Sequence, residues 1–146
     1  MALYSMGVSK AAPTTGTCIA MIRPASSNDV SIREIGVFNS TAVASSVGLV
    51  RTATTGTPST SALVQSDIPG LTAGGTNIDT AWSAAPTIAA VYFRKIVLPA
   101  TIGAGIIWSF EPRDLIARNG ATTQVCLWNF GAGTAAALEV YVVIEE

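Results

Sequence analysis

The side chains in this sequence that could perform chemistry are nine carboxylates and two cysteines, because the chain contains no histidine. Histidine is the commonest general base and the commonest metal ligand in proteins. Its absence excludes serine–histidine and cysteine–histidine catalysis by this chain. Two carboxylates could still act as acid and base in sugar hydrolysis, so the acidic residues are the remaining candidates for a catalytic site.

Glu111 and Asp114 are the best candidates for such a pair, since a turn through Pro112 and Arg113 would bring both carboxylates beside a guanidinium. Solvated turn charges with a local salt bridge explain the same cluster more simply. We therefore predict that the protein has no catalytic residues and is not an enzyme.

Asp67 and Asp79 could bind Ca²⁺ together with backbone carbonyls of a long loop. No Asp-x-Asp spacing accompanies them, and the glycine pairs of the chain lack the strand and helix context of a phosphate-binding loop. The sequence therefore predicts neither a metal ion nor another cofactor.

Three residues are predicted to lie at an interface or a ligand surface. Trp82 lies beside a long, weakly patterned stretch, and an exposed tryptophan could contact a partner or stack on a sugar ring. Leu3 and Tyr4 could anchor the N-terminal segment on a neighbouring subunit. Trp108 and Trp128, by contrast, lie within strand-like runs and are predicted to pack in the core.

Cys18 and Cys126 are far apart in the sequence. The first six residues lack the basic leader and the long apolar stretch of a secretion signal, so we expect folding in the cytosol, where thiols stay reduced. Two buried thiols are therefore the preferred interpretation. A position on neighbouring strands, and a disulfide between them, remain alternatives.

The chain is short of charge, with eight basic and nine acidic residues among 146. An ordinary domain of this length carries about 36 charged residues. Because soluble domains keep charge on their surface, we predict that other subunits or a partner cover part of this one. Only Arg94 and Lys95 are adjacent basic residues, so direct nucleic-acid binding is not expected.

No membrane association is predicted either. The longest apolar stretch, residues 80–93, contains Pro86 and is followed by Arg94 and Lys95. It is also shorter than the roughly 20 residues that a transmembrane helix requires.

Short runs rich in β-branched and aromatic residues, separated by Gly, Pro, Asn and Ser, predict an all-β fold. No segment keeps apolar residues at a helical period over three turns. The expected fold is an antiparallel β-sandwich, jelly-roll-like, of about eight strands, with a partly open Greek-key barrel as the alternative. The expected strands are residues 18–23, 30–38, 47–52, 88–98, 105–110, 114–117, 123–130 and 138–144.

The patterns within these strands add detail. Residues 138–144 alternate between apolar and wetter positions, so one face is core. Residues 123–130 are apolar on both faces, which is typical of a central strand covered twice, the second time by another subunit. In residues 30–38 the apolar face changes sides at Arg33 and Glu34, which predicts a β-bulge.

Two segments are predicted to lie outside the regular strands. Residues 1–17, with Pro13 and several Thr and Gly, are expected to form an N-terminal arm, and residues 18–146 a single β-sandwich domain. Residues 53–81 are expected to form an extended loop within that domain. Because long structureless loops are usually functional, this loop is predicted to contact a partner.

Two stretches of the chain carry a resemblance to a known family. They are residues 30–41 (VSIREIGVFNST), and residues 105–116 (GIIWSFEPRDLI) together with 125–131 (VCLWNFG). They resemble the small all-β structural proteins of tailed bacteriophages, especially head decoration or cement proteins, over about half of the chain.

This resemblance implies a β-sandwich that assembles as a homo-oligomer, with a trimer favoured, on the virion capsid surface after synthesis in the host cytoplasm. Its partner would be the major capsid protein, whose neighbouring subunits it cements. The alternative is a receptor- or glycan-binding virion module, a tail tip or head fibre component, which would use exposed aromatic residues around Trp82.

Overall fold

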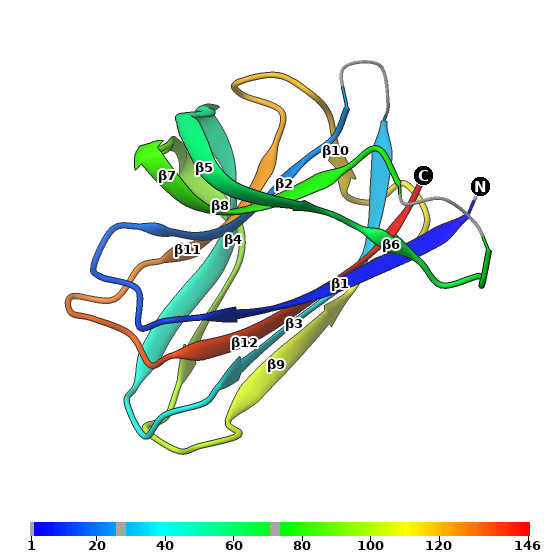
Figure 1. Ribbon diagram of the computed structural model, residues 1–146. Coiled ribbons are helices and arrows are strands. Elements are labelled where there is room, and N and C mark those ends of the chain that lie inside the picture. Colours follow the sequence, from blue (N-terminus) through cyan, green and yellow to red (C-terminus); the bar gives the residue numbers. More distant parts are fainter. Residues whose placement is uncertain (1, 26–28, 71–73) are drawn as a thin grey trace.

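The computed structural model describes residues 2–25, 29–70 and 74–146. These residues form twelve β-strands in two antiparallel sheets that pack face to face (Figure 1). The prediction of an all-β antiparallel sandwich is confirmed, whereas the expected number of about eight strands is too low. Within the described ranges, no helix has the length and apolarity to span a membrane.

Sheet A contains the strand order β10-β3-β12-β1-β6, and β9 also pairs with β3. Its central strands β12 and β1 are paired along eight residues, from Leu3 opposite Glu145 to Lys10 opposite Leu138. The strands of this sheet are β1 (Leu3–Lys10), β3 (Val30–Asn39), β6 (Gln65–Ser66), β9 (Gly105–Ser109), β10 (Ile116–Ala117) and β12 (Leu138–Glu145).

Sheet B has the order β5-β7-β2-β11-β4-β8, so β5 and β8 are its two edges. The predicted strand 18–23 matches β2 at both ends. The strands of this sheet are β2 (Cys18–Arg23), β4 (Ser45–Thr54), β5 (Thr57–Leu63), β7 (Asn77–Ala84), β8 (Thr87–Leu98) and β11 (Val125–Asn129).

Four strands of sheet B belong to one long, bent ribbon. β4 leads into β5, and β7 leads into β8, so that Thr54 lies opposite Thr87 just before the bend and Thr57 opposite Ala84 just after it. Gly56 lies at the bend with a φ of +67°, and a Cβ there would lie 2.4 Å from the carbonyl oxygen of Ala84. Only glycine fits this position. The bend places the two halves of the ribbon at opposite edges of sheet B.

The main core lies between the sheets. It is built from inward-facing residues of both, for example Ile35, Val140 and Val142 from sheet A and Leu49 and Leu127 from sheet B. The alternation predicted for residues 138–144 is confirmed, since the even-numbered residues of β12 are buried. This burial of aliphatic side chains is the principal stabilising term of the fold.

The predicted bulge in β3 is confirmed. Glu34 lies opposite Val143, whereas the next residue of β12, Ile144, lies opposite Ile32. Arg33 is therefore the extra residue of the bulge. Residues three positions apart face opposite sides of a regular strand. Because of the bulge, Ile32 and Ile35 both face the core.

The predicted arm and loop are largely strands. Residues 3–10 of the expected arm form β1, which pairs with β12 and packs Tyr4, Met6 and Val8 against the main core. The expected loop 53–81 contains β5, β6 and most of β7, while its residues 71–73 lie outside the described residues. β5 and β6 consist mostly of short polar residues on exposed positions, which gives them a weak sequence signal, and the register of β5 against β7 shifts three times between Thr57 and Ser61.

Candidate functional site

A second, smaller apolar cluster lies on the outer face of sheet B. Its buried members are Cys18, Met21, Val50 and Cys126, and Trp82, Ile88, Trp128 and Phe130 pack against them. Trp82 belongs to β7 and Ile88 to β8, so the bent ribbon supplies part of the cover. The second face of β11 was predicted to be covered by another subunit, and here the chain itself provides that cover.

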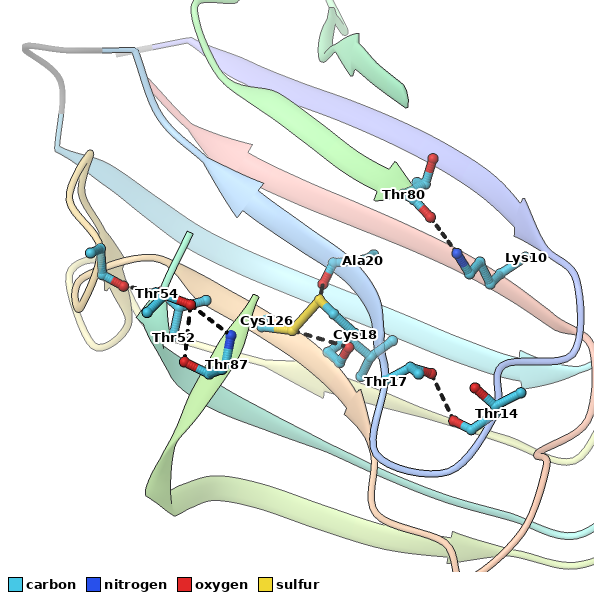
Figure 2. Close-up of a disulfide and its surroundings, with 12 residues drawn as sticks. Lys10, Thr14, Thr17, Cys18, Ala20, Thr52, Thr54, Thr80, Thr87 and Cys126 are labelled. Atoms are coloured by element: carbon cyan, nitrogen blue, oxygen red, sulfur yellow. Dashed lines mark hydrogen bonds between the residues drawn. A yellow bond between two sulfur atoms is a disulfide. The ribbon is translucent and has the colours of Figure 1, made fainter. Parts of the chain in front are cut away.

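Cys18 and Cys126 form a disulfide in this cluster (Figure 2), with their Cα atoms 6.4 Å apart. The prediction of two reduced thiols is wrong. β2 and β11 are antiparallel neighbours, and their pairing brings together two residues separated by 108 positions in the sequence. The expected cellular compartment could not predict this disulfide, because the bond depends on which strands are neighbours.

Trp82, the first predicted interface residue, is half-buried and packs against the second cluster. The ammonium of Lys10 lies 5.7 Å from the centre of its ring and donates a hydrogen bond to the carbonyl oxygen of Thr80. Burial lowers the pKa of Lys10. The indole nitrogen is buried without a hydrogen-bond partner among the described residues. Trp82 thus borders an open groove of about 400 Å³, but its ring is not a free platform.

Leu3 and Tyr4, the other predicted interface residues, lie at the start of β1. Lys10, which contacts Trp82, lies at the end of the same strand. Leu3 is exposed, and Tyr4 packs against the main core. The seven steps from Leu3 to Lys10 span roughly 24 Å at about 3.4 Å per residue. The structure therefore does not bring the three predicted residues together into one site.

Glu111 and Asp114 flank a turn in which the Asp114 N–H donates to the Glu111 carbonyl oxygen over 3.1 Å. They line an open hollow of about 430 Å³ with Arg33 and Glu34. Among the described residues, no ion pair joins Arg113 to either carboxylate, so the predicted local salt bridge is wrong. Arg113 has a φ of 71°, and its N–H donates to the Ser31 hydroxyl, which fixes the turn without the salt bridge.

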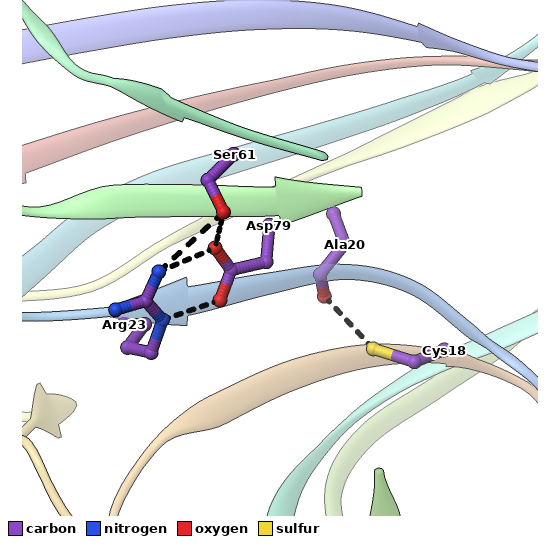
Figure 3. A network of polar contacts seen from close by, with 5 residues as sticks. All are labelled: Cys18, Ala20, Arg23, Ser61 and Asp79. Atoms are coloured by element: carbon purple, nitrogen blue, oxygen red, sulfur yellow. Dashed lines mark hydrogen bonds and ion pairs between the residues drawn. The ribbon is translucent and has the colours of Figure 1, made fainter. Parts of the chain in front are cut away.

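Asp79 is buried in an ion pair instead of lying in a loop. The Arg23 Nε lies 2.6 Å from its Oδ2 and the Arg23 Nη2 lies 2.9 Å from its Oδ1, while Ser61 on β5 donates a further hydrogen bond (Figure 3). The hydrogen bond to Asp79 raises the pKa of Arg23. Asp67 accepts from the Ser5 hydroxyl. Within residues 2–25, 29–70 and 74–146, no three His, Cys, Asp or Glu side chains form a group that could hold a metal ion.

The two most exposed large apolar side chains, Val91 and Val97, lie on β8, which is the edge of sheet B opposite β5. We call this the β8 surface, and it consists of residues 91–97. Val91 is 78% exposed, Tyr92 49%, Phe93 36% and Val97 69%. Ile102, in the connection to β9, and Ile107, on β9, are exposed as well. Large exposed apolar patches on a soluble domain mark interaction sites.

Three basic side chains of this region lie over aromatic rings. The guanidinium carbon of Arg51 is 5.2 Å from the centre of the Phe93 ring, and that of Arg94 is 5.8 Å from the Phe110 ring. The Lys95 ammonium is 5.1 Å from the centre of the Phe130 ring. Such contacts hold a cation at the surface without neutralising its charge. The site therefore combines apolar side chains, positive charge and an open strand edge.

The sequence reasoning predicted β8 as a strand but did not single out its residues as a site. The available signal was the run Val91-Tyr92-Phe93 followed by two cations, which breaks the alternation of a half-buried strand. Known proteins give no further guide, because no family model, no curated protein and no solved structure matches the chain.

Proposed function

We propose that the protein is a structural virion protein that binds the outside of a phage capsid and cements neighbouring capsid subunits. The observation that carries the proposal is the set of exposed apolar side chains on β8, the β8–β9 connection and β9, namely Val91, Val97, Ile102 and Ile107. A buried contact would remove this surface from water, which is favourable by about 25 cal/mol per Å² of apolar area.

The size of the molecule is compatible with this role. Stable protein contacts bury about 800 Å² on each partner, and the chain exposes 6687 Å². A small domain with one apolar side can therefore make such a contact and keep other surface for a homo-oligomer. The resemblance to decoration proteins favours a trimer, with Leu3, Tyr4 and Trp82 as the predicted interface residues.

The disulfide supports a place on the virion. Disulfides persist in oxidising surroundings such as the exterior of particles and cells, whereas the cytosol keeps thiols reduced. A chain made in a host cytoplasm would close the Cys18–Cys126 bond after release. The cross-link would then stabilise the protein where capsid subunits need holding together.

The glycan-binding alternative is less well supported by the geometry. As predicted, it requires an exposed ring at Trp82, but this side chain is half-buried with Lys10 over its ring. Glycan-array binding that disappears in Trp82→Ala, with no effect on capsid stability, would favour this alternative.

The proposal is tested by adding the purified protein to undecorated shells of tailed bacteriophages. We expect co-sedimentation with the shells and a higher shell melting temperature, because a ligand that binds only the assembled state stabilises it. Light scattering of the free protein should give a mass well above the 15.0 kDa of one chain. A monomeric mass together with failure to bind shells would overturn the proposal.

A further inference from the structure

The outer edge of β8 is open. Within the described part of the chain, β8 pairs with β4 alone. From Arg94 to Leu98 this pairing is regular, with Arg94 opposite Leu49 and Leu98 opposite Ser45, whereas the register shifts between Leu49 and Thr54. Alternate residues of a regular edge strand point their N–H and C=O groups outward. Residues 94–98 therefore offer unused backbone donors and acceptors in strand geometry.

The basic residues divide into two groups. Arg23, Arg33 and Arg118 each form an ion pair with a carboxylate of the same chain. The structure describes no such pair for the other five basic residues, and three of these five, Arg51, Arg94 and Lys95, lie at or beside β8. Burial, and then the charge of Arg118, lowers the pKa of Arg51, which is expected for a guanidinium without an acidic partner.

Charge decides which occupant fits the β8 surface. If β8 paired with β8 of a second copy, the contact would bring together two sets of Arg51, Arg94 and Lys95, and the repulsion among these six positive charges would oppose the pairing. Nucleic acid would need more phosphate contacts than three cations provide. An extended polypeptide with acidic side chains complements both the open backbone and the charge.

We propose that β8 binds an extended segment of a partner protein by strand addition, and that this segment carries Asp or Glu beside apolar residues. Backbone hydrogen bonds to residues 94–98 would supply affinity, as in other strand-addition complexes. Acidic side chains of the segment would face Arg94, Lys95 and Arg51, and its apolar side chains would cover Val97 and Tyr92. This inference names the partner surface of the proposed capsid-binding function and therefore depends on it.

The test uses fluorescent peptides and the folded, oxidised protein. One peptide has two adjacent Glu residues flanked by Val and Thr, so that one carboxylate lies on each face of the added strand; a second has Lys in place of Glu, and a third is the Glu peptide with N-methyl groups along one strand edge. We expect anisotropy to show binding of the Glu peptide alone. Arg94→Gln/Lys95→Gln should weaken that binding at least tenfold, and Lys10→Gln, which removes a ring-stacked cation on the β7 side, should leave it unchanged.

Each contrary result is informative. Lack of binding by the Glu peptide, equal binding of the N-methylated peptide, or full binding by Arg94→Gln/Lys95→Gln would overturn strand addition at β8. Binding of oligo-dT or of phosphatidylserine vesicles that requires Arg94 and Lys95, without peptide binding, would assign the surface to nucleic acid or membrane instead. Urea midpoints equal to wild type would show that the variants are folded.

The same variants separate this inference from the proposed function. If phage shells bind wild type and Arg94→Gln/Lys95→Gln equally and the Glu peptide is not bound, the capsid role stands and strand addition at β8 fails. If the Glu peptide binds and shells do not, the site at β8 stands and the capsid role fails.

Discussion

The two edge strands of sheet B, β5 and β8, face solvent in the same sheet but present different chemistry. β5 has the sequence TPSTSAL, whose short side chains include a proline, a residue that lacks a backbone donor and hinders the pairing of an edge with other chains. β8 exposes Val91, Tyr92 and Val97. The contrast therefore lies in the exposed side chains, which are short and polar along most of β5 and large and apolar, beside Arg94 and Lys95, on β8. The open apolar edge of β8 is then a candidate for a functional surface.

The two edges also differ in how they are held from inside. Ser61 of β5 and Arg23 of β2 bind the buried carboxylate of Asp79 of β7 in one partly buried polar network. At β8, Arg94 and Lys95 lie on the rings of Phe110 and Phe130 and have no carboxylate in the described structure. The β5 edge is therefore held by an internal ion pair, whereas the cations at β8 can still pair with carboxylates of a partner.

The largest expected effect concerns the disulfide, which joins the strands between the two edges. Cys18→Ala/Cys126→Ala should lower the free energy of unfolding by about 3 to 4 kcal/mol, because the cross-link closes a loop of 108 residues in the unfolded chain. Urea unfolding measures the change. Dithiothreitol should shift the wild-type midpoint and leave that of the variant unchanged. A wild-type midpoint insensitive to dithiothreitol would contradict the pairing.

The next largest effect tests the ion pair between Arg23 and Asp79 on the β5 side. Asp79→Ala should destabilise the protein by about 2 to 3 kcal/mol, because it leaves Arg23 without its buried partner while the partly exposed guanidinium can still reach water. Asp67→Ala, which removes an exposed hydrogen bond to Ser5, is the control and should cost below about 1 kcal/mol. Equal losses in the two variants would remove the distinction between the edges.

Exchanging one residue between the edges should separate binding from stability. Val97→Thr on β8 and Thr60→Val on β5 change exposed positions, so each should alter stability by no more than about 0.5 kcal/mol. We expect Val97→Thr to weaken shell binding about tenfold, since it removes apolar contact, and Thr60→Val to have no effect on it. Similar affinities for both variants would show that β8 is no special surface.

The smallest expected change in stability concerns Tyr141 in sheet A, which serves as a control because it lies in neither edge strand of sheet B. The Tyr141 hydroxyl donates to Glu34 over 2.5 Å, and this hydrogen bond raises the pKa of Tyr141 from 10.0 to about 12. Because the folded pKa lies above the unfolded one, the resulting stability is complete below about pH 10 and is lost as the pH rises from 10 to 12.

Tyr141→Phe should therefore reduce the alkaline loss of stability without affecting shell binding. Urea unfolding at several pH values between 9 and 12 would measure the first effect, and co-sedimentation the second. An unchanged alkaline profile in the variant would mean that the Tyr141 hydrogen bond does not contribute.

Strands with strong local signals could be predicted from the sequence. Residues 18–23 are a run of apolar residues that ends at Arg23 and Pro24, and the bulge at Arg33 follows from a change of apolar face. β5 could not be found in this way, because Thr and Ser of an edge strand have no buried side to create alternation. Its strand character comes from pairing with β7, a partner about twenty residues away.

The candidate site was harder to predict than the fold for a related reason. Val91 and Val97 lie in a strand that the sequence predicts, but whether a strand is central or at an edge depends on the order of all strands in the sheet. The distribution of ion pairs is also a long-range property, since Arg23 finds Asp79 and Arg33 finds Glu145 far along the chain. That Arg94 and Lys95 form no ion pair among the described residues therefore becomes visible only in the folded structure.

The two ends of the chain lie side by side (Figure 1), where Ala2 and Glu146 exchange backbone hydrogen bonds of 2.9 and 3.1 Å. β1 and β12 are antiparallel and start their pairing at these ends, with Leu3 opposite Glu145. A pull on the two ends would therefore open the ladder like a zip, one pair of bonds after another, and would meet little resistance. The proposed capsid role would therefore require mechanical load to pass across the sides of the sandwich and not along β1 and β12 from these two residues.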